Sequence, residues 1–379
     1  MISKTIKANS TEAISNEIDK AISDGFKPTL AVVFSSVKQD WKAVSDILDK
    51  KEIAVFGATT SGEFIDGDIE EGSIAIMLLD INPAYFKLKF LETGEKNSFE
   101  NAKSIGVYGK ESFANAAFII LSGWLTQDGE LIVQGFTEGF GKEATIFGGM
   151  AGDDLLLEGP LVFTNSQSST KGLLALIIDE DKIEINGIAT CGWKPIGTAK
   201  TITKSKDNIV YTIDNQPALD MILKYLGMEN EFDSGKEMLS QLTAFYPLQM
   251  ERKGVDPVMR TAMFANREDR SLICAGNVPQ GSKVKFSLPP DFDAIEIVID
   301  ECNELKSNHQ QTADALIMFS CISRHLSFGI LMEEEIGQVK DVWNAPMVGF
   351  FSYGEFGKSK TGKHEFHKNT CCVVALKEK

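Results

Sequence analysis

The sequence has little that would place it in a membrane or in an oxidising compartment. Its 379 residues contain no run near the ~20 apolar residues that cross a bilayer. The opening residues lack the apolar core of a signal peptide, so we expect a cytoplasmic protein. The six cysteines form no Cys-x-x-Cys pair and no metal-ligand spacing. We therefore expect reduced cysteines, with the adjacent Cys371 and Cys372 on opposite faces of a strand.

Basic residues are also scarce, since 38 Lys and Arg face 54 Asp and Glu, for a formal charge of -16. An acidic surface repels nucleic acid backbones and anionic membranes, so we expect neither as a partner. Such a charge favours solubility, or small ligands that bear a cationic group. The histidines show no triad and no zinc signature; they are His309, His325, His364 and His367.

A glycine-rich motif near the start returns near the end of the chain. Residues 55–64 (VFGATTSGEF) and residues 348–356 (VGFFSYGEF) share two glycines, a glutamate and a phenylalanine in the same frame. Gly57 and Gly62 have the spacing of a phosphate-binding loop, but the next residue is Glu63 and not lysine, so we reject nucleotide binding. A duplicated site and a pair of tight turns whose glutamates cap backbone amides both remain open. Residues 146–154 (IFGGMAGDD) are a weaker third relative.

The flanking elements repeat as well. The patterns predict a helix over residues 11–22, a strand over 30–36, a helix over 41–49, and strands over 53–57 and 73–79. The order strand, helix, strand, strand returns at residues 117–178 and 315–376. We expect residues 30–79 and 315–376 to superpose, with Gly57 on Gly349 and Glu63 on Glu355. The predicted fold class is α/β, with mixed β-sheets built from duplicated strand-helix-strand-strand units flanked by helices.

The segment between the second and third copies follows another pattern. Residues 199–214 predict a hairpin, residues 217–225 a helix, and residues 244–288 strand-like runs broken by turns. Residues 227–235 are acidic and predicted to be loose, and residues 291–305 are predicted to be helical. We place a domain boundary near 215, which gives domains of residues 1–214 and 215–379.

These motifs resemble those of the FIST proteins, bacterial sensory proteins with an N-terminal and a C-terminal FIST domain. The motifs are residues 57–63 (GATTSGE), 148–154 (GGMAGDD), 320–324 (SCISR) and 349–355 (GFFSYGE), and the resemblance covers about residues 30–376. It implies a sensor of small ligands such as amino acids. It also implies a signal-transduction partner such as a histidine kinase, a cyclase or a chemotaxis component.

The candidate site lies where parallel strands end, because open α/β sheets bind ligands at that edge. Small hydroxyls, carboxylates and one arginine gather there, which suits a small polar molecule. Arg324 could bind a ligand carboxylate, while Glu63 or Glu355 binds an ammonium group. The alternative for Arg324 is a structural ion pair with an internal acid such as Glu355. The residues expected to contact the ligand are Thr59, Thr60, Ser61, Glu63, Asp153, Asp154, Cys321, Arg324, Ser352, Tyr353 and Glu355.

Other functions compete with a binding protein. Asp153 and Asp154 could hold a divalent ion, but adjacent carboxylates without further ligands are more typical of a turn, so we expect no metal. A thiol enzyme would use Cys321 as nucleophile and His325 as base. A haem-based gas sensor is the third hypothesis, because some members of the resembled family bind haem. We expect no enzyme activity and no cofactor, since no convincing nucleophile-base pair is present.

Overall fold

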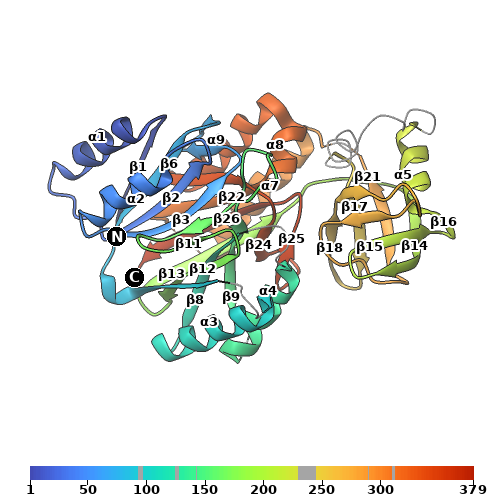
Figure 1. The fold of residues 1–379 in the computed structure, drawn as a ribbon, viewed down its shortest axis with the longest axis horizontal. Coiled ribbons are helices and arrows are strands. Elements are labelled where there is room, and N and C mark those ends of the chain that lie inside the picture. Colours follow the sequence, from blue (N-terminus) through green and yellow to red (C-terminus); the bar gives the residue numbers. More distant parts are fainter. Residues whose placement is uncertain (93–96, 124–127, 142, 229–244, 289, 310–311) are drawn as a thin grey trace.

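The computed structural model describes residues 1–92, 97–123, 128–141, 143–228, 245–288, 290–309 and 312–379. Over these residues the chain forms four sheets. Three sheets and their helices form a body, and the fourth forms a smaller unit at one side of it (Figure 1). Among the described residues, no helix combines the length and apolar character needed to span a membrane.

The body repeats one unit three times. The first unit consists of β1 (Ile2–Ala8), α1 (Thr11–Ile22), β2 (Leu30–Ser36), α2 (Trp41–Asp49), β3 (Ala54–Thr60), β4 (Glu63–Ile65), β5 (Asp68–Glu70) and β6 (Ile74–Asp80). The second consists of η1 (Pro83–Tyr85), β7 (Phe86–Glu92), α3 (Ser98–Ser112), β8 (Ala116–Ser122), α4 (Gly129–Phe140), β9 (Thr145–Met150), β10 (Val162–Phe163), β11 (Ser168–Ser169) and β12 (Gly172–Asp179). The third consists of β13 (Ile183–Thr190), α7 (Phe292–His309), β22 (Ala315–Cys321), α8 (Ile322–Phe328), η2 (Gly329–Leu331), α9 (Met332–Trp343), β23 (Met347–Ser352), β24 (Glu355–Lys358), β25 (His364–His367) and β26 (Cys371–Glu378).

Strand pairing confirms the repeat that the sequence predicts. In each unit two strands pair in parallel across a helical crossover, β2 with β3, β8 with β9 and β22 with β23. The first strand of each pair also runs antiparallel to the last strand of its unit. Three glycines occupy the same place in these registers, because Val33 pairs with Gly57, Ile120 with Gly148, and Met318 with Gly349. Residues 117–178 are therefore a full copy of the unit, the second along the chain.

The three units exchange their hairpins in a cycle. The hairpin β4–β5 of the first unit extends the third sheet through β23, β24–β25 extends the second through β9, and β10–β11 extends the first through β3. Each exchanged strand places a phenylalanine opposite the glycine of the receiving unit. The pairs are Phe64 with Gly349, Phe356 with Gly148, and Phe163 with Gly57. At Gly57 and Gly349 an aromatic ring occupies the space of a side chain, since a Cβ on Gly57 would lie 2.3 Å from the Phe163 ring. A Cβ on Gly148 would instead lie 1.9 Å from the Ile120 carbonyl oxygen.

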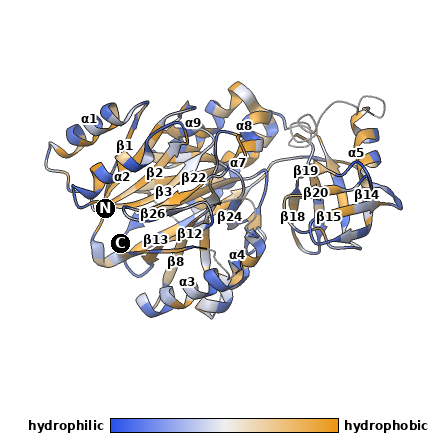
Figure 2. Ribbon diagram, in the orientation of Figure 1, coloured by the Kyte–Doolittle hydropathy of each residue, from blue (hydrophilic) through white to orange (hydrophobic). Residues whose placement is uncertain are grey.

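Continuous apolar strands form because both faces of these sheets are covered. Along β2, Ala31 and Val33 pack towards Ile14 and Val44 of the helices, while Phe34 faces the core shared with the other units. In that shared core the Phe34 and Phe350 ring centroids lie 4.6 Å apart. The hydropathy colouring shows apolar strands beneath helices that are polar on their outer faces (Figure 2). Burial on both faces is the pattern expected for strands of a parallel pair.

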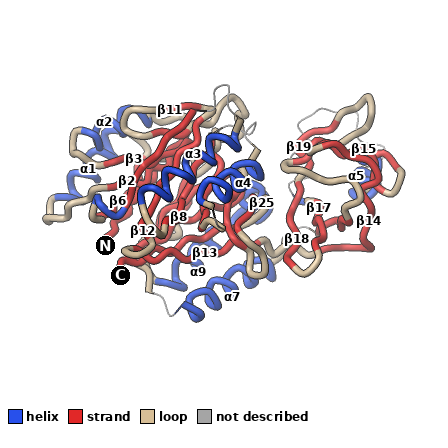
Figure 3. Tube along the Cα trace, turned by 90° about the horizontal axis from the view of Figure 1, so that it is seen from below, coloured by secondary structure: helices blue, strands red, loops and turns tan. Residues whose placement is uncertain are grey.

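The fourth sheet is inserted between β13 and α7 of the third unit. It contains β14 (Pro195–Lys206), β15 (Ile209–Ile213), β16 (Gln216–Pro217), β17 (Leu248–Arg252), β18 (Val255–Arg260), β19 (Ala262–Ala265), β20 (Leu272–Cys274) and β21 (Lys283–Ser287), with α5 (Ala218–Leu226) beside it. This inserted unit has its own apolar core, which includes Ile202, Leu219 and Leu272. Figure 3 shows it joined to the body by two connecting segments. The boundary placed near 215 falls between β15 and β16 of this sheet, and residues 229–235 of the acidic segment lie outside the described residues.

Candidate functional site

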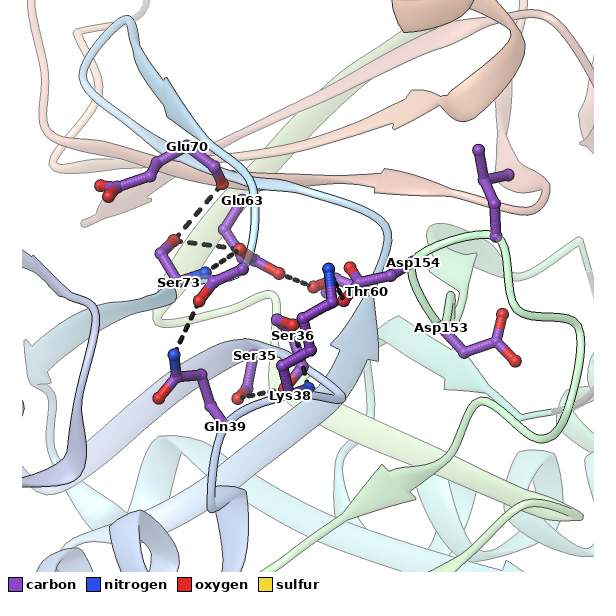
Figure 4. A network of polar contacts seen from close by, with 12 residues as sticks. Ser35, Ser36, Lys38, Gln39, Thr60, Glu63, Glu70, Ser73, Asp153 and Asp154 are labelled. Atoms are coloured by element: carbon purple, nitrogen blue, oxygen red, sulfur yellow. Dashed lines mark hydrogen bonds and ion pairs between the residues drawn. The ribbon is translucent and has the colours of Figure 1, made fainter.

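Glu63 of the first glycine-glutamate loop is buried and bonded within its own unit. Its carboxylate accepts hydrogen bonds from the Thr60 hydroxyl, the Ser73 backbone N–H (3.0 Å) and the Ser73 hydroxyl (3.0 Å). Figure 4 shows Thr60 and Ser73 gathered around this side chain. The glutamate thus ties the end of β3 to the start of β6, which is the amide-capping role that the sequence left open.

Glu355 repeats this arrangement in the third unit. It accepts from the Ser352 hydroxyl (2.7 Å), the Thr370 hydroxyl (2.7 Å) and the Thr370 backbone N–H (3.3 Å). Each glutamate therefore bonds a hydroxyl three residues earlier and the residue just before the unit's last strand. The duplicated motif encodes two separate structural networks, and their carboxylates are already occupied by protein donors.

Burial raises the pKa of both carboxyls, Glu63 and Glu355, from an ordinary 4.5 to about 7. The folded state therefore holds protons that the unfolded state releases at lower pH, so the free energy of unfolding should fall as pH rises from about 4.5 to 7. Each carboxyl should contribute on the order of 3 kcal/mol to this fall. We expect Glu63→Gln and Glu355→Gln each to remove part of this pH dependence, because an amide does not titrate in this range. The amide can still donate and accept hydrogen bonds, so the fold should be kept. Urea unfolding of the variants at pH 5 and pH 8 checks this; slopes equal to wild type would contradict it.

The third loop differs, because its acids bind other parts of the chain. The Tyr353 hydroxyl donates to Asp153 Oδ1 (2.6 Å), and Asp153 also accepts the backbone N–H groups of residues 157–159. Asp154 accepts from the Ser36 hydroxyl (2.7 Å) and lies 3.5 Å from the Lys38 ammonium. In Figure 4 the Asp153 carboxylate points away from the Glu63 cluster. Asp153 and Asp154 are thus turn and inter-unit residues.

Arg324 is wholly buried in an internal ion pair, and its partner is Glu335 of α9. Its Nε and Nη2 atoms donate to the Glu335 carboxylate, and Nη1 donates to the backbone oxygens of Cys191 and Asn369. The guanidinium also packs against the Trp193 and Phe328 rings, which contact each other edge to face. Arg324 therefore forms a structural ion pair, which was the alternative to ligand binding in the sequence analysis. Its partner is Glu335 and not Glu355. We do not place a ligand carboxylate on this arginine.

The remaining predicted site residues are also engaged or enclosed. The Thr59 hydroxyl accepts from the Leu161 N–H (2.9 Å), and Ser61 is buried, with its backbone N–H donating to the Phe351 carbonyl (3.3 Å). Cys321 is buried, and burial raises the pKa of its thiol to about 12. A thiol held in this form is a poor nucleophile, which disfavours the thiol-enzyme hypothesis.

A cavity of about 340 Å³ lies where the second unit, the third unit and the inserted unit meet. The body contributes Asp128 and Gly129 at the start of α4, Met150 at the end of β9, and Phe366 and Lys368. Residues of β19, β20 and the turns beside them form the opposite wall. We call this the Lys368 cavity. The cavity lies beside the carboxyl end of β9, but none of the eleven residues that the sequence predicted to contact a ligand lines it.

Lys368 is the cation of this cavity, and its side chain is 5% exposed. Among the described residues, its ammonium donates to the Tyr353 carbonyl and rests 5.1 Å from the centroid of the Phe366 ring. Burial lowers the pKa of this lysine because the charged form loses its hydration. No described carboxylate forms an ion pair with it. Glu355 attracts the ammonium from beyond ion-pair distance, so the charge lacks only the direct carboxylate partner that buried ammonium groups normally have.

Asp128 faces the same cavity and supplies the opposite charge. Its Oδ1 atom caps α4 by accepting from the N–H groups of Glu130 (2.9 Å) and Leu131 (3.2 Å). Among the described residues, no donor bonds its other carboxylate oxygen, Oδ2. Sequence reasoning missed Asp128 and Lys368, because Lys368 stands among the polar residues His367, Asn369 and Thr370 and nothing local shows that it is buried.

Comparisons with known proteins identify the sequence families. The profile described as FIST N domain matches residues 29–216, and the profile described as FIST C domain matches residues 218–358. Together the two matches cover most of the chain, including all three glycine-rich motifs. No curated protein matches the sequence.

Proposed function

Because the chain belongs to the FIST family, whose domains act as sensory domains in signal transduction, we propose that it senses a small polar ligand in the Lys368 cavity. The observation that carries this proposal is the buried ammonium of Lys368, which contacts a backbone carbonyl and an aromatic ring but forms no ion pair with a carboxylate of the described residues. A ligand carboxylate would supply the missing charge. The cavity volume is near the lower end of the range of about 300–1,000 Å³ for small-molecule sites.

An amino acid fits the two charges of this cavity. Its carboxylate would bind Lys368, and its ammonium would bind the Oδ2 atom of Asp128. Met150 and Phe366 from the body, with Phe264 and Ile273 from the inserted unit, offer apolar surface for a side chain. The expected ligand is thus the small zwitterion or carboxylate that the motifs suggested, with Lys368 in the role first given to Arg324.

The position of the cavity suggests how binding becomes a signal. Its walls come from the body and from the inserted unit, so a ligand that contacts both favours one relative placement of the two. A separate signal-transduction protein, such as a histidine kinase, a cyclase or a chemotaxis component, would recognise the placement that the ligand favours. The differential affinity of the ligand for the two placements sets the size of the shift.

Replacing Lys368 with methionine tests the proposal. A thermal-shift screen of amino acids and small organic acids should find a ligand for the wild type. At about a hundred times its dissociation constant, that ligand should stabilise the fold by roughly 2.7 kcal/mol. Lys368→Met should remove this shift. It should also raise the melting temperature of the free protein, because methionine fills a similar volume without a desolvated charge.

Lys360→Met is the matched control, since Lys360 is about half exposed and forms an ion pair with Glu304 outside the cavity. This variant should respond to the ligand as the wild type does. A ligand that stabilises Lys368→Met as strongly as wild type would place the site elsewhere. A screen in which only cationic or apolar compounds stabilise the protein would show that the cavity does not bind carboxylates.

A further inference from the structure

The charges that line the Lys368 cavity do not balance. Among the described residues of the lining, Lys368 is the one cation, while Asp128 and Asp207 are both carboxylates. Asp128 belongs to the body, at the start of α4, and Asp207 belongs to the inserted unit. A zwitterion that binds Lys368 and Asp128 brings no net charge. The lining therefore carries one more negative charge than an amino acid with a neutral side chain can match.

Asp207 lies in the tight turn between β14 and β15. Lys206 pairs with Ile209, so Asp207 and Asn208 form a two-residue connection between the strands. Asp207 has a left-handed backbone conformation, with a φ of 52°, which aspartate adopts more readily than most residues do. Its backbone carbonyl accepts from the Val278 N–H (3.0 Å), which ties the turn to the segment after β20. The backbone thus fixes the place of this residue on the cavity wall.

The carboxylate of Asp207 is accessible and has no cationic partner in the described part of the chain. The residue is exposed, and its side chain forms no hydrogen bond and no ion pair with the described residues. Arg260, whose guanidinium lies next to Gly276 of the same wall, already pairs with Glu130. A cationic group on the ligand would therefore meet no described protein cation in competition for Asp207.

The inserted unit also supplies apolar surface for an alkyl chain. Met263 and Phe264 of β19 and Ile273 of β20 line the cavity together with Asp207. Phe264 is 42% exposed, so much of its ring is left in water. Methylene groups of a ligand that cover this ring would remove apolar area from water, which is favourable. The inserted unit thus offers an apolar surface and a carboxylate, in addition to the two charges of the body.

We propose that the ligand of the Lys368 cavity is a basic amino acid, whose side-chain cation binds Asp207. This inference rests on the proposed function and names the class of its ligand. The carboxylate of the ligand binds Lys368, its α-ammonium binds Asp128, and its methylene chain packs on Phe264. A flexible four-carbon stem such as that of lysine adapts to the separation of the charged groups. The cation contacts the inserted unit, so a basic amino acid holds the two units together more firmly than a neutral one.

Calorimetric titration with L-lysine, L-norleucine and cadaverine tests the proposal. Norleucine lacks the side-chain ammonium of lysine, and cadaverine lacks its carboxylate. The wild type should bind lysine about tenfold more tightly than either analogue, because each analogue loses one charged contact. Asp207→Asn keeps a residue that tolerates the left-handed turn. This variant should lose about tenfold in affinity for lysine and bind norleucine within about twofold of wild type.

Asp214→Asn is the matched control, since Asp214 also has a positive φ (48°) in the inserted unit but pairs with Lys200 outside the cavity. It should bind lysine as the wild type does. Equal affinity of the wild type for lysine and norleucine, or an undiminished preference for lysine in Asp207→Asn, would overturn the basic amino acid and leave the Lys368 site in place. No binding of lysine to the wild type would also overturn it. The thermal-shift screen with Lys368→Met then decides separately whether another ligand occupies the cavity.

Discussion

Replacing Arg324 with alanine should lower the melting temperature by about 10 °C, independently of any ligand. The substitution leaves Glu335 as an unpaired carboxylate at a position that is 0% exposed. Breaking a buried ion pair from one side costs about 3–5 kcal/mol, a large part of the roughly 5–15 kcal/mol that holds a protein folded. Circular dichroism melting of the free variant measures the effect.

A paired variant separates the cost of the broken pair from the cost of lost packing. Arg324→Met combined with Glu335→Leu removes both charges and keeps apolar volume, so it should recover most of the lost stability. An Arg324→Ala protein that melts like wild type but no longer binds its ligand would restore the ligand-binding role that the sequence suggested.

Gly349→Ala should destabilise the protein about as much as Arg324→Ala does, because a side chain at this position would clash with its neighbours. A Cβ at this position would lie 2.2 Å from the Phe64 ring and 2.5 Å from the Met318 carbonyl oxygen. Phe64 belongs to the hairpin that the first unit gives to the third, so relief of the contact requires the exchanged strand to move. We expect a loss of roughly 3 kcal/mol or more, measured by urea unfolding.

Two further variants distinguish this contact from a general intolerance of alanine. Gly337→Ala, in α9, meets no atom within 4 Å and should stabilise the protein by about 0.5–1 kcal/mol. Phe64→Leu in the Gly349→Ala background should return part of the loss. Unchanged stability of Gly349→Ala alone would show that the hairpin exchange does not need this glycine.

Local patterns predicted the elements well because each depends on its own residues. The helix at residues 11–22 and the strand at 30–36 have the predicted bounds, since the Ser10 cap, the buried Ile14 and Ile18, and the continuous apolar run are local features. Gly62 adopts a positive φ (111°), as glycine in a tight turn can, whereas Gly354 does not and is needed because the Phe366 ring excludes a Cβ. That constraint comes from a distant segment, and no local pattern contains it.

The hairpin exchange and the candidate site depend on such distant contacts. Nothing near Glu63 shows that its hairpin pairs with β23, some 285 residues later in the chain. Arg324 resembled a free cation because its partner Glu335 lies on the following helix, and α8 and η2 set their approach. The Lys368 cavity needs the inserted unit as its second wall, and the position of that unit is not encoded in any motif.

Native mass spectrometry of gently purified protein tests most directly whether a small ligand occupies the Lys368 cavity. The wild type should carry a small-molecule adduct, either as purified or after incubation with amino acids and small carboxylates, and mild activation should release it. Lys368→Met should remain folded and carry none, while Lys360→Met should match the wild type. The same adduct on Lys368→Met, or no adduct on any of the three proteins, would contradict the assignment of the site.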